Sequence, residues 1–239
     1  MIEKIINGIK YCLNEETMTA EVIAKRNGYE GDIIIPETVV FKKVSYLVTN
    51  IDEHAFYNCK SLISITIPDS VTSIGERAFE NCVSLTSIVI PDGVTTIGEA
   101  TFDCCSSLTS IVIPNGVTSI GEGAFESCSS LKAITISNSV KSIGEWAYAY
   151  CRYMTDITIP DGVKSIGVAA FDHCESLTSI VISNSVCIIG EGAFFGCESL
   201  ITINYTGTIA QWNQITLGED WNYDVPTKIV HCTDGNVEI

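Results

Sequence analysis

The sequence is poor in basic residues and has no long apolar run. Its 239 residues include 13 Lys and Arg against 29 Asp and Glu, a formal net charge of −16. This balance argues against nucleic acid as a partner, because neutralising phosphates requires clustered Lys and Arg, and it disfavours anionic membrane surfaces. No run of 18 apolar residues occurs, so the sequence predicts no segment inserted in a membrane.

Histidines are scarce, and catalytic motifs are missing. Only His54, His173 and His231 are present, and no Gly-rich phosphate loop, Gly-x-Ser-x-Gly or His-Glu-x-x-His occurs. Such patterns hold phosphates, nucleophiles or zinc, so we expect a protein that is not an enzyme and holds no cofactor. Residues 1–8 lack the apolar core of a signal peptide. Either the protein stays inside the cell or a leader was removed beforehand.

What the chain does have is one pattern repeated every 23 residues. It is complete in residues 65–87 and restarts at Ile88, Ile111, Ile134, Ile157, Ile180 and Ile203. A period of this length indicates a solenoid. Leu-x-x-Ile-x-Ile has the alternation of a strand, which a following proline or serine ends. A recurring glycine (Gly75 in the first full unit) predicts a second bend with positive φ, and Ala-Phe-x-x-Cys predicts only a short 3₁₀ turn.

The two ends depart from the repeat. Residues 1–32 alternate on either side of a turn at 14–17, which predicts a β-hairpin that caps the first coil. Seven coils are expected over 33–202, the first lengthened by a hairpin inserted at about 39–47. After Ile203 the pattern fails, and residues 203–239, with Trp212 and Trp221, are expected to form a C-terminal cap. The whole chain is predicted to be one structural domain.

The repeat resembles the leucine-rich repeats, and closely the BspA-type subfamily, over about residues 33–203. The shared unit is Leu-x-x-Ile-x-Ile-Pro-x-x-Val-x-x-Ile-Gly-x-x-Ala-Phe-x-x-Cys, present in nearly every coil. The resemblance implies the α/β leucine-rich-repeat family in a form that is mostly β, namely a right-handed parallel β solenoid with short 3₁₀ turns and capped ends. It also implies a surface protein of the kind that often binds host or matrix proteins.

Two ladders of identical residues have alternative interpretations. Seven of the eleven cysteines recur every 23 residues: Cys59, Cys82, Cys105, Cys128, Cys151, Cys174 and Cys197. Neighbouring rungs come within disulfide distance, but a ladder has no preferred pairing and does not converge as zinc ligands do. We therefore expect buried free thiols. A glutamate row, Glu53, Glu76, Glu99, Glu122, Glu145 and Glu191, either recruits Ca²⁺ or forms a solvated edge that prevents sideways association. We favour the edge.

One coil, residues 134–156, departs from the others: Trp146 stands where they have Arg77, Ala100, Gly123 or Gly192, and the coil carries further aromatic and basic residues. Trp146, Tyr150, Arg152 and Tyr153 are expected to point outwards, whereas Tyr148 and Met154 take internal positions. Tryptophan, tyrosine and arginine dominate binding hot spots. We therefore predict a binding module for a protein or glycoconjugate, a surface adhesin by resemblance.

Other interpretations of this coil remain open. Packing between coils, a homo-oligomer contact, or a structural spacer without a small ligand would also account for its composition. The outward strand positions, such as Val89 and Val112, are a second candidate face.

Overall fold

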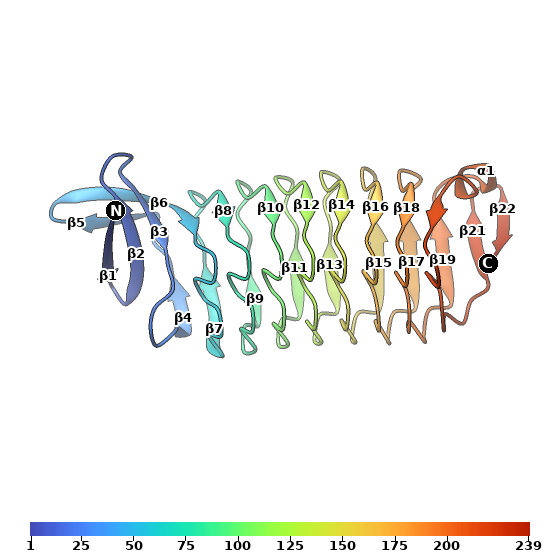
Figure 1. Ribbon diagram of the computed structural model, residues 1–239, viewed down its shortest axis with the longest axis horizontal. Coiled ribbons are helices and arrows are strands. Elements are labelled where there is room, and N and C mark those ends of the chain that lie inside the picture. Colours follow the sequence, from blue (N-terminus) through green and yellow to red (C-terminus); the bar gives the residue numbers. More distant parts are fainter.

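The computed structural model describes residues 1–239 as an elongated stack of coils with the two termini at opposite ends (Figure 1). Strands and turns make up nearly all of it, and the only helix is the four-residue α1 (Ile209–Trp212). The expected mostly-β content is confirmed.

Each repeat contributes a strand to one side of the stack, and these strands are parallel and in register. They are β7 (Ser61–Thr66), β9 (Ser87–Ile88), β11 (Ser110–Val112), β13 (Ala133–Thr135), β15 (Asp156–Ile159), β17 (Ser179–Ile182) and β19 (Thr202–Tyr205). Ile111 pairs with Ile134, and Ile157 with Ile180. Because the register equals the sequence period, every residue lies beside its own equivalent in the next coil.

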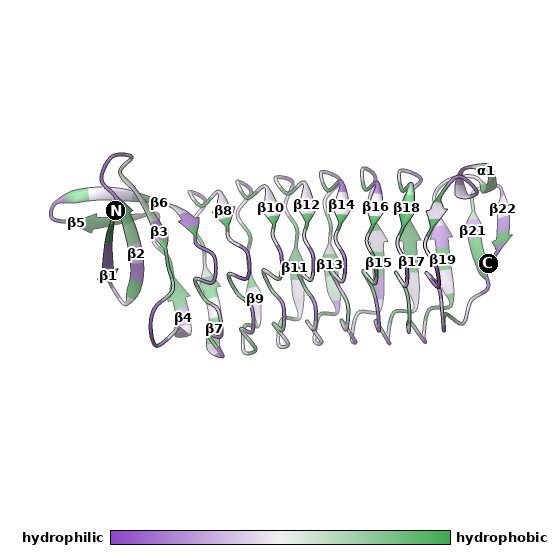
Figure 2. Ribbon diagram, in the orientation of Figure 1, coloured by the Kyte–Doolittle hydropathy of each residue, from purple (hydrophilic) through white to green (hydrophobic).

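A second, two-residue strand lies on another side of each coil. These strands are β8 (Ser73–Ile74), β10 (Thr96–Ile97), β12 (Ser119–Ile120), β14 (Ser142–Ile143), β16 (Ser165–Ile166) and β18 (Ile188–Ile189). β10, β12, β14, β16 and β18 form one parallel sheet. The isoleucine at the second position of each strand is buried, whereas Ile188 at the first position of β18 is exposed. Hydrophobic colouring recurs in this strand from coil to coil in Figure 2.

The core is a column of stacked rings that runs along the stack. Neighbouring ring centroids are 5.0–5.4 Å apart and the rings are within 11° of parallel, through Phe56, Phe79, Phe102, Phe125, Tyr148, Phe171 and Phe194. Burying each ring stabilises the fold by about 1.5–3 kcal/mol. Tyr148 and Met154 are fully buried, as predicted.

The cysteine ladder runs beside this column, and all seven thiols are buried, as expected. From Cys82 onwards, each sulfur donates to the carbonyl oxygen of the aromatic residue in the preceding coil, for example Cys82 to Phe56 at 3.1 Å and Cys174 to Tyr148 at 3.2 Å. Burial raises the pKa of the Cys82 thiol well above its ordinary value. The ladder therefore consists of protonated, packed thiols.

The turn side of each coil consists of isolated i→i+3 turns, without a continuous 3₁₀ helix. Separate turns close through bonds such as Cys59 N–H to Phe56 O at 3.0 Å, but residues of positive φ, four apart, interrupt them, as at His54 (57°) and Asn58 (58°). This alternation sends every second N–H to the next coil, as from Phe56 to Ala78 O at 2.8 Å. The turn side is thus a hydrogen-bonded ladder rather than a row of helices.

The glycine ladder, Gly75, Gly98, Gly121, Gly144, Gly167 and Gly190, does not have the expected positive φ. At every position except Gly98, the reason for glycine is close approach of neighbouring backbones. A Cβ on Gly144 would lie 2.5 Å from the carbonyl carbon of Gly121, and one on Gly167 would lie 2.5 Å from that of Gly144. Glycine is needed here because the coils touch, not because the chain bends.

The N-terminal end covers the first coil with a small sheet. β1 (Ile2–Ile6), β2 (Ile9–Asn14) and β3 (Thr19–Val22) are antiparallel neighbours, and β3 continues in parallel onto β6 (Val44–Ile51). β5 (Thr38–Phe41) forms a hairpin with β6, and β4 (Glu30–Ile34) pairs with β7. Tyr29 packs on Phe56 at 4.6 Å between ring centroids, which covers one end of the ring column.

At the C-terminal end the coil geometry continues beyond the recognisable pattern. β20 (Thr216–Leu217) pairs with β18 through Ile189 and Leu217. The Phe194 N–H donates to Trp221 O at 2.8 Å, as each earlier phenylalanine does to the next coil. The offset here is 28 residues, from Gly190 to Gly218, instead of 23, and α1 lies within the longer segment. Trp221 meets Phe194 edge-on, and β21 (Ile229–Cys232) and β22 (Gly235–Glu238) complete the end.

The glycine ladder yields a prediction with a matched control. Gly144→Ala should lower the free energy of unfolding by about 1–3 kcal/mol, because its Cβ meets only backbone atoms. Gly98→Ala, at the same ladder position, should cost less than about 1 kcal/mol, since its Cβ meets the flexible Glu76 side chain. Urea unfolding measures both. Equal losses would contradict the close-approach account.

The ring column yields a second prediction. The Tyr148 hydroxyl is buried with no hydrogen-bond partner, so Tyr148→Phe should raise the free energy of unfolding by about 1 kcal/mol. The Tyr29 hydroxyl donates to Ile23 O at 2.8 Å and accepts from Lys10 N at 3.1 Å, so Tyr29→Phe should lower it by a similar amount. Urea unfolding of both variants tests the pair, and changes of the same sign would refute it.

Candidate functional site

Trp146 and Tyr150 occupy the two positive-φ positions of one turn, with φ of 52° and 59°. The first position holds Gly123, Ala169 and Gly192 in the nearest coils, and His54 and Arg77, also at positive φ, in coils nearer the N-terminus. A bulky side chain in this conformation is a genuine outlier, and such strain costs about 1–3 kcal/mol per residue. The coil therefore tolerates two unfavourable residues side by side.

Burial does not explain them. The Trp146 side chain is 48% exposed, and Tyr150 is half-buried. Tyr153 is 60% exposed, and Arg152, also exposed, forms an ion pair with Glu175 of the next coil at 3.4 Å. The predicted outward orientation is therefore present, most clearly for Trp146 and Tyr153.

The structure divides these four residues instead of joining them. Trp146 and Tyr150 line one depression of about 320 Å³, which we call the Trp146 depression. Tyr150 and Arg152 line a second, of about 340 Å³, towards Ser127 and Ser129. Tyr153 lines neither of these depressions. The Trp146 depression is the better-defined site because it has walls on several coils.

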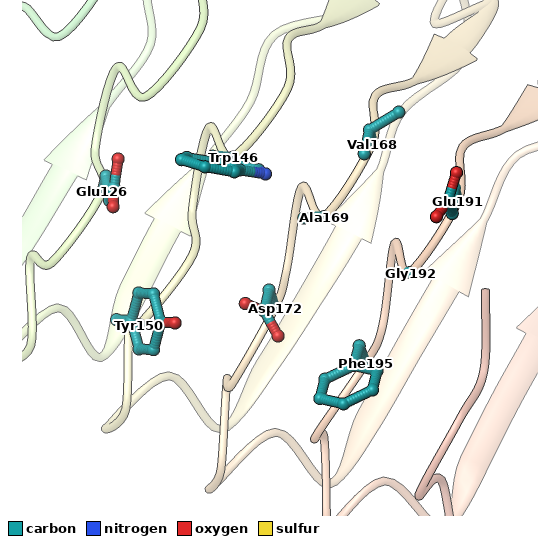
Figure 3. A pocket seen from close by; sticks show the side chains of 9 residues that line it. All are labelled: Glu126, Trp146, Tyr150, Val168, Ala169, Asp172, Glu191, Gly192 and Phe195. Carbon is teal, nitrogen blue, oxygen red and sulfur yellow. The ribbon is translucent and has the colours of Figure 1, made fainter. Parts of the chain in front are cut away.

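The shape of the Trp146 depression follows from side-chain size. Rings and small residues from successive coils surround it (Figure 3): Trp146, Tyr150, Phe195, Val168, Ala169 and Gly192. Trp146 rises from its coil, whereas the equivalent positions in the next two coils carry only Ala169 and Gly192. The hollow is the space that these small residues leave beside the indole.

An aromatic row borders the site and contributes two of its rings, Tyr150 and Phe195, to the lining. Tyr150 stacks on His173 at 5.2 Å, His173 lies 5.6 Å from Phe195, and Phe195 stacks on Tyr223 at 5.2 Å. Gly196 makes the row possible, because a Cβ there would lie 3.2 Å from His173 Cγ. The sequence analysis missed this row. The 23-residue spacing of Tyr150 and His173 was a signal, but Phe195 lies one residue out of phase.

The site is negatively charged. Three carboxylates from three coils line it, Glu126, Asp172 and Glu191, and no Lys or Arg does. Burial raises the pKa of Glu126, and the charges of nearby acids, Asp172 among them, raise it further. An Asp172 oxygen lies 2.6 Å from His173 Nδ1. Negative charge in the depression is thus only partly balanced by its surroundings.

The two other candidate features differ from this site. In the glutamate row, Glu99 is held by Arg77, which also pairs with Glu80 at 3.1 Å, and no cluster of three or more His, Cys, Asp or Glu side chains is arranged to hold a metal ion. On the strand face, Val89 and Val112 are 79% and 64% exposed, in a depression of about 580 Å³. That surface has no aromatic anchor.

Parallel in-register strands, short turns and a 23-residue unit define a leucine-rich-repeat protein. Residues 37–154 and 95–218 match the BspA type leucine rich repeat region, in six copies. The chain belongs to this family, which confirms the resemblance seen in the sequence. No protein of curated function matches the chain.

Solved structures of bacterial proteins share the fold. The T. pallidum leucine rich repeat protein is 26% identical with a TM-score of 0.61, over 91% of this chain and 86% of that one. A leucine rich cell surface protein from Faecalibacterium prausnitzii is 23% identical with a TM-score of 0.50, over 90% and 98%. The pneumococcal vaccine antigen PcpA is 16% identical with a TM-score of 0.55, over 98% and 88%. No helix in the structure is long and apolar enough to cross a membrane.

The strain at Trp146 yields a third prediction. Trp146→Gly should leave the free energy of unfolding within about 1 kcal/mol of the wild type, because relief of the positive φ offsets the greater freedom of glycine when unfolded. Trp221→Gly, which removes a buried ring at the column end, should cost about 3–5 kcal/mol. Urea unfolding distinguishes the two. A large loss for Trp146→Gly would assign that residue to packing.

Proposed function

We propose that the chain is a non-enzymatic binding module for a protein or glycoconjugate and that the Trp146 depression is its binding surface. The observation that carries this proposal is Trp146 itself. It is half-exposed, it has a bulky side chain at a positive φ, and the two adjacent coils carry only Gly123 and Ala169 at the same position. Strained residues gather where function requires them, and exposed aromatics anchor interfaces.

A position on the cell surface, in the manner of an adhesin, is part of the proposal. It is supported by family membership and by the fold shared with a protein described as a cell surface protein and with a pneumococcal vaccine antigen. The right-handed sense of the coil belongs to the proposal as well, because parallel crossover connections are right-handed in nearly all known cases.

The alternative, a self-associating spacer, has less support. A homo-oligomer formed through the Trp146 depression would bring together like-charged surfaces of a chain with net charge −16, and juxtaposed like charges oppose association. Exposed aromatics are compatible with both functions, so oligomeric state must be measured alongside binding.

A binding experiment tests the proposal. Purified host matrix glycoproteins, each with and without enzymatic removal of glycans, are passed over the immobilised protein. We expect at least one to bind, with at least a tenfold loss of affinity for the Trp146→Ala, Tyr150→Ala double variant. A Val89→Ala, Val112→Ala variant on the strand face serves as the control and should bind normally. Loss of binding on deglycosylation would identify the ligand as a glycan.

Sedimentation of the free protein tests the alternative, self-association. A mass that rises with concentration, and that returns to the monomer in the Trp146→Ala variant, would make self-association the function of this surface. Unchanged binding of every partner by the double variant would move the site elsewhere on the molecule.

A further inference from the structure

The Trp146 depression combines partly unbalanced negative charge with an indole that no other ring covers. Its lining includes Glu126, Asp172 and Glu191 and no basic side chain. Arg152 and His173, on the turns beside the depression, are already engaged, Arg152 by Glu175 and His173 by Asp172. We propose that the depression binds an arginine side chain of a polypeptide partner. This inference rests on the proposed binding function and names the chemistry that the site recognises.

The indole supplies the first contact. Trp146 pairs with no other aromatic ring in the structure, whereas His173 lies between Tyr150 and Phe195, and Phe195 also stacks on Tyr223. The face of an aromatic ring carries the negative end of its quadrupole, and tryptophan is the best cation–π partner. Trp146 therefore offers an attractive surface to a cation.

The carboxylates supply the second contact and select the kind of cation. Asp172 lies between Tyr150 and Phe195, across the depression from Trp146 (Figure 3). A planar guanidinium stacks on an aromatic face and also pairs with a carboxylate through two hydrogen bonds. An ammonium group is a compact point charge that lacks this fork. Arginine is therefore favoured over lysine.

The size of the site favours a side chain over an extended glycan. A volume of about 320 Å³ is at the lower end of the roughly 300–1,000 Å³ found for small-molecule pockets. Val168, Phe195 and Tyr150 provide apolar walls for the methylene groups of an arginine. Sugars stack on flat, open ring faces, whereas Tyr150 and Phe195 are each already packed against a neighbouring ring.

The net charge of the whole molecule also favours a basic ligand. The chain carries a net charge of −16, and the exposed Glu122 and Glu145 lie on the coils beside the site. A field of one sign accelerates encounter with an oppositely charged partner, and salt weakens it. A partner segment with arginine in a basic context is therefore the complementary ligand.

The test uses synthetic peptides and the full chain. A twelve-residue Gly-Ser peptide containing three arginines is compared with versions that carry citrulline, lysine or glutamate in their place. Binding is followed by the NMR signal of the Trp146 indole N–H in ¹⁵N-labelled protein. Citrulline is the decisive control because it preserves the planar shape and removes the charge. We expect the arginine peptide to bind at least tenfold more tightly than the citrulline peptide, and more tightly than the lysine peptide.

Variants locate the effect within the site. Asp172→Asn should weaken arginine-peptide binding at least fivefold, and Trp146→Gly should abolish it. Glu191→Gln, on an exposed residue, provides a second charge variant if Asp172→Asn proves unstable. Val112→Ala should bind as the wild type does. Raising NaCl from 50 to 500 mM should weaken binding of the arginine peptide and leave the citrulline peptide unaffected.

The outcomes separate this inference from the proposed function. Equal binding of the arginine and citrulline peptides, or an indole shift produced instead by a neutral oligosaccharide, overturns it. A matrix protein that binds through Trp146 and Tyr150 but is insensitive to Asp172→Asn and to competing arginine peptide overturns the inference and retains the proposed function. If the protein binds neither the arginine peptide nor any matrix protein through Trp146 and Tyr150, both the inference and the proposed function are overturned.

Discussion

The rest of the structure depends on the parallel ladders that hold each residue beside its equivalent one coil away. The period in the sequence and the register of the strands are the same number, so a residue suited to one position must also be suited to its own neighbour. Phenylalanine meets this condition by stacking, cysteine by donating to the carbonyl above it, and glycine by letting backbones touch. Each ladder therefore repeats one favourable contact between every pair of neighbouring coils.

Departures from the repeat are informative because a residue that follows the repeat only reproduces a contact already present between other coils. Tyr148 interrupts the phenylalanine column with a hydroxyl that has no partner, and two residues away Trp146 and Tyr150 occupy strained backbone positions. Three unfavourable substitutions thus lie in a single coil. Trp146 and Tyr150 line a hollow, so binding accounts for them where core packing does not. Tyr148 does not line that hollow, and its place in the column has no structural explanation.

Much of the fold could be predicted from the sequence because a period states which residues become neighbours. The inward positions of Tyr148 and Met154 and the burial of the cysteine ladder followed directly. Period alone does not state backbone conformation, so the paired positive-φ residues and the true role of Gly144 were not foreseen. It also misses neighbours out of phase. Phe195 contacts His173 because Gly196 has no side chain. Glu126 and Asp172 share one repeat position two coils apart and Glu191 occupies another, so the charged depression cannot be seen in any single unit.

The Trp146 depression is assembled from four successive coils, from Glu126 to Phe195. Neighbouring repeats are so alike that unequal exchange between their coding segments could add or remove a whole coil while every ladder closes again. Such an event would preserve the fold. It would nevertheless change which carboxylates and rings face Trp146. In this architecture, recognition is encoded in the order of nearly interchangeable units, and new specificities can arise by rearrangement without any point mutation in the core.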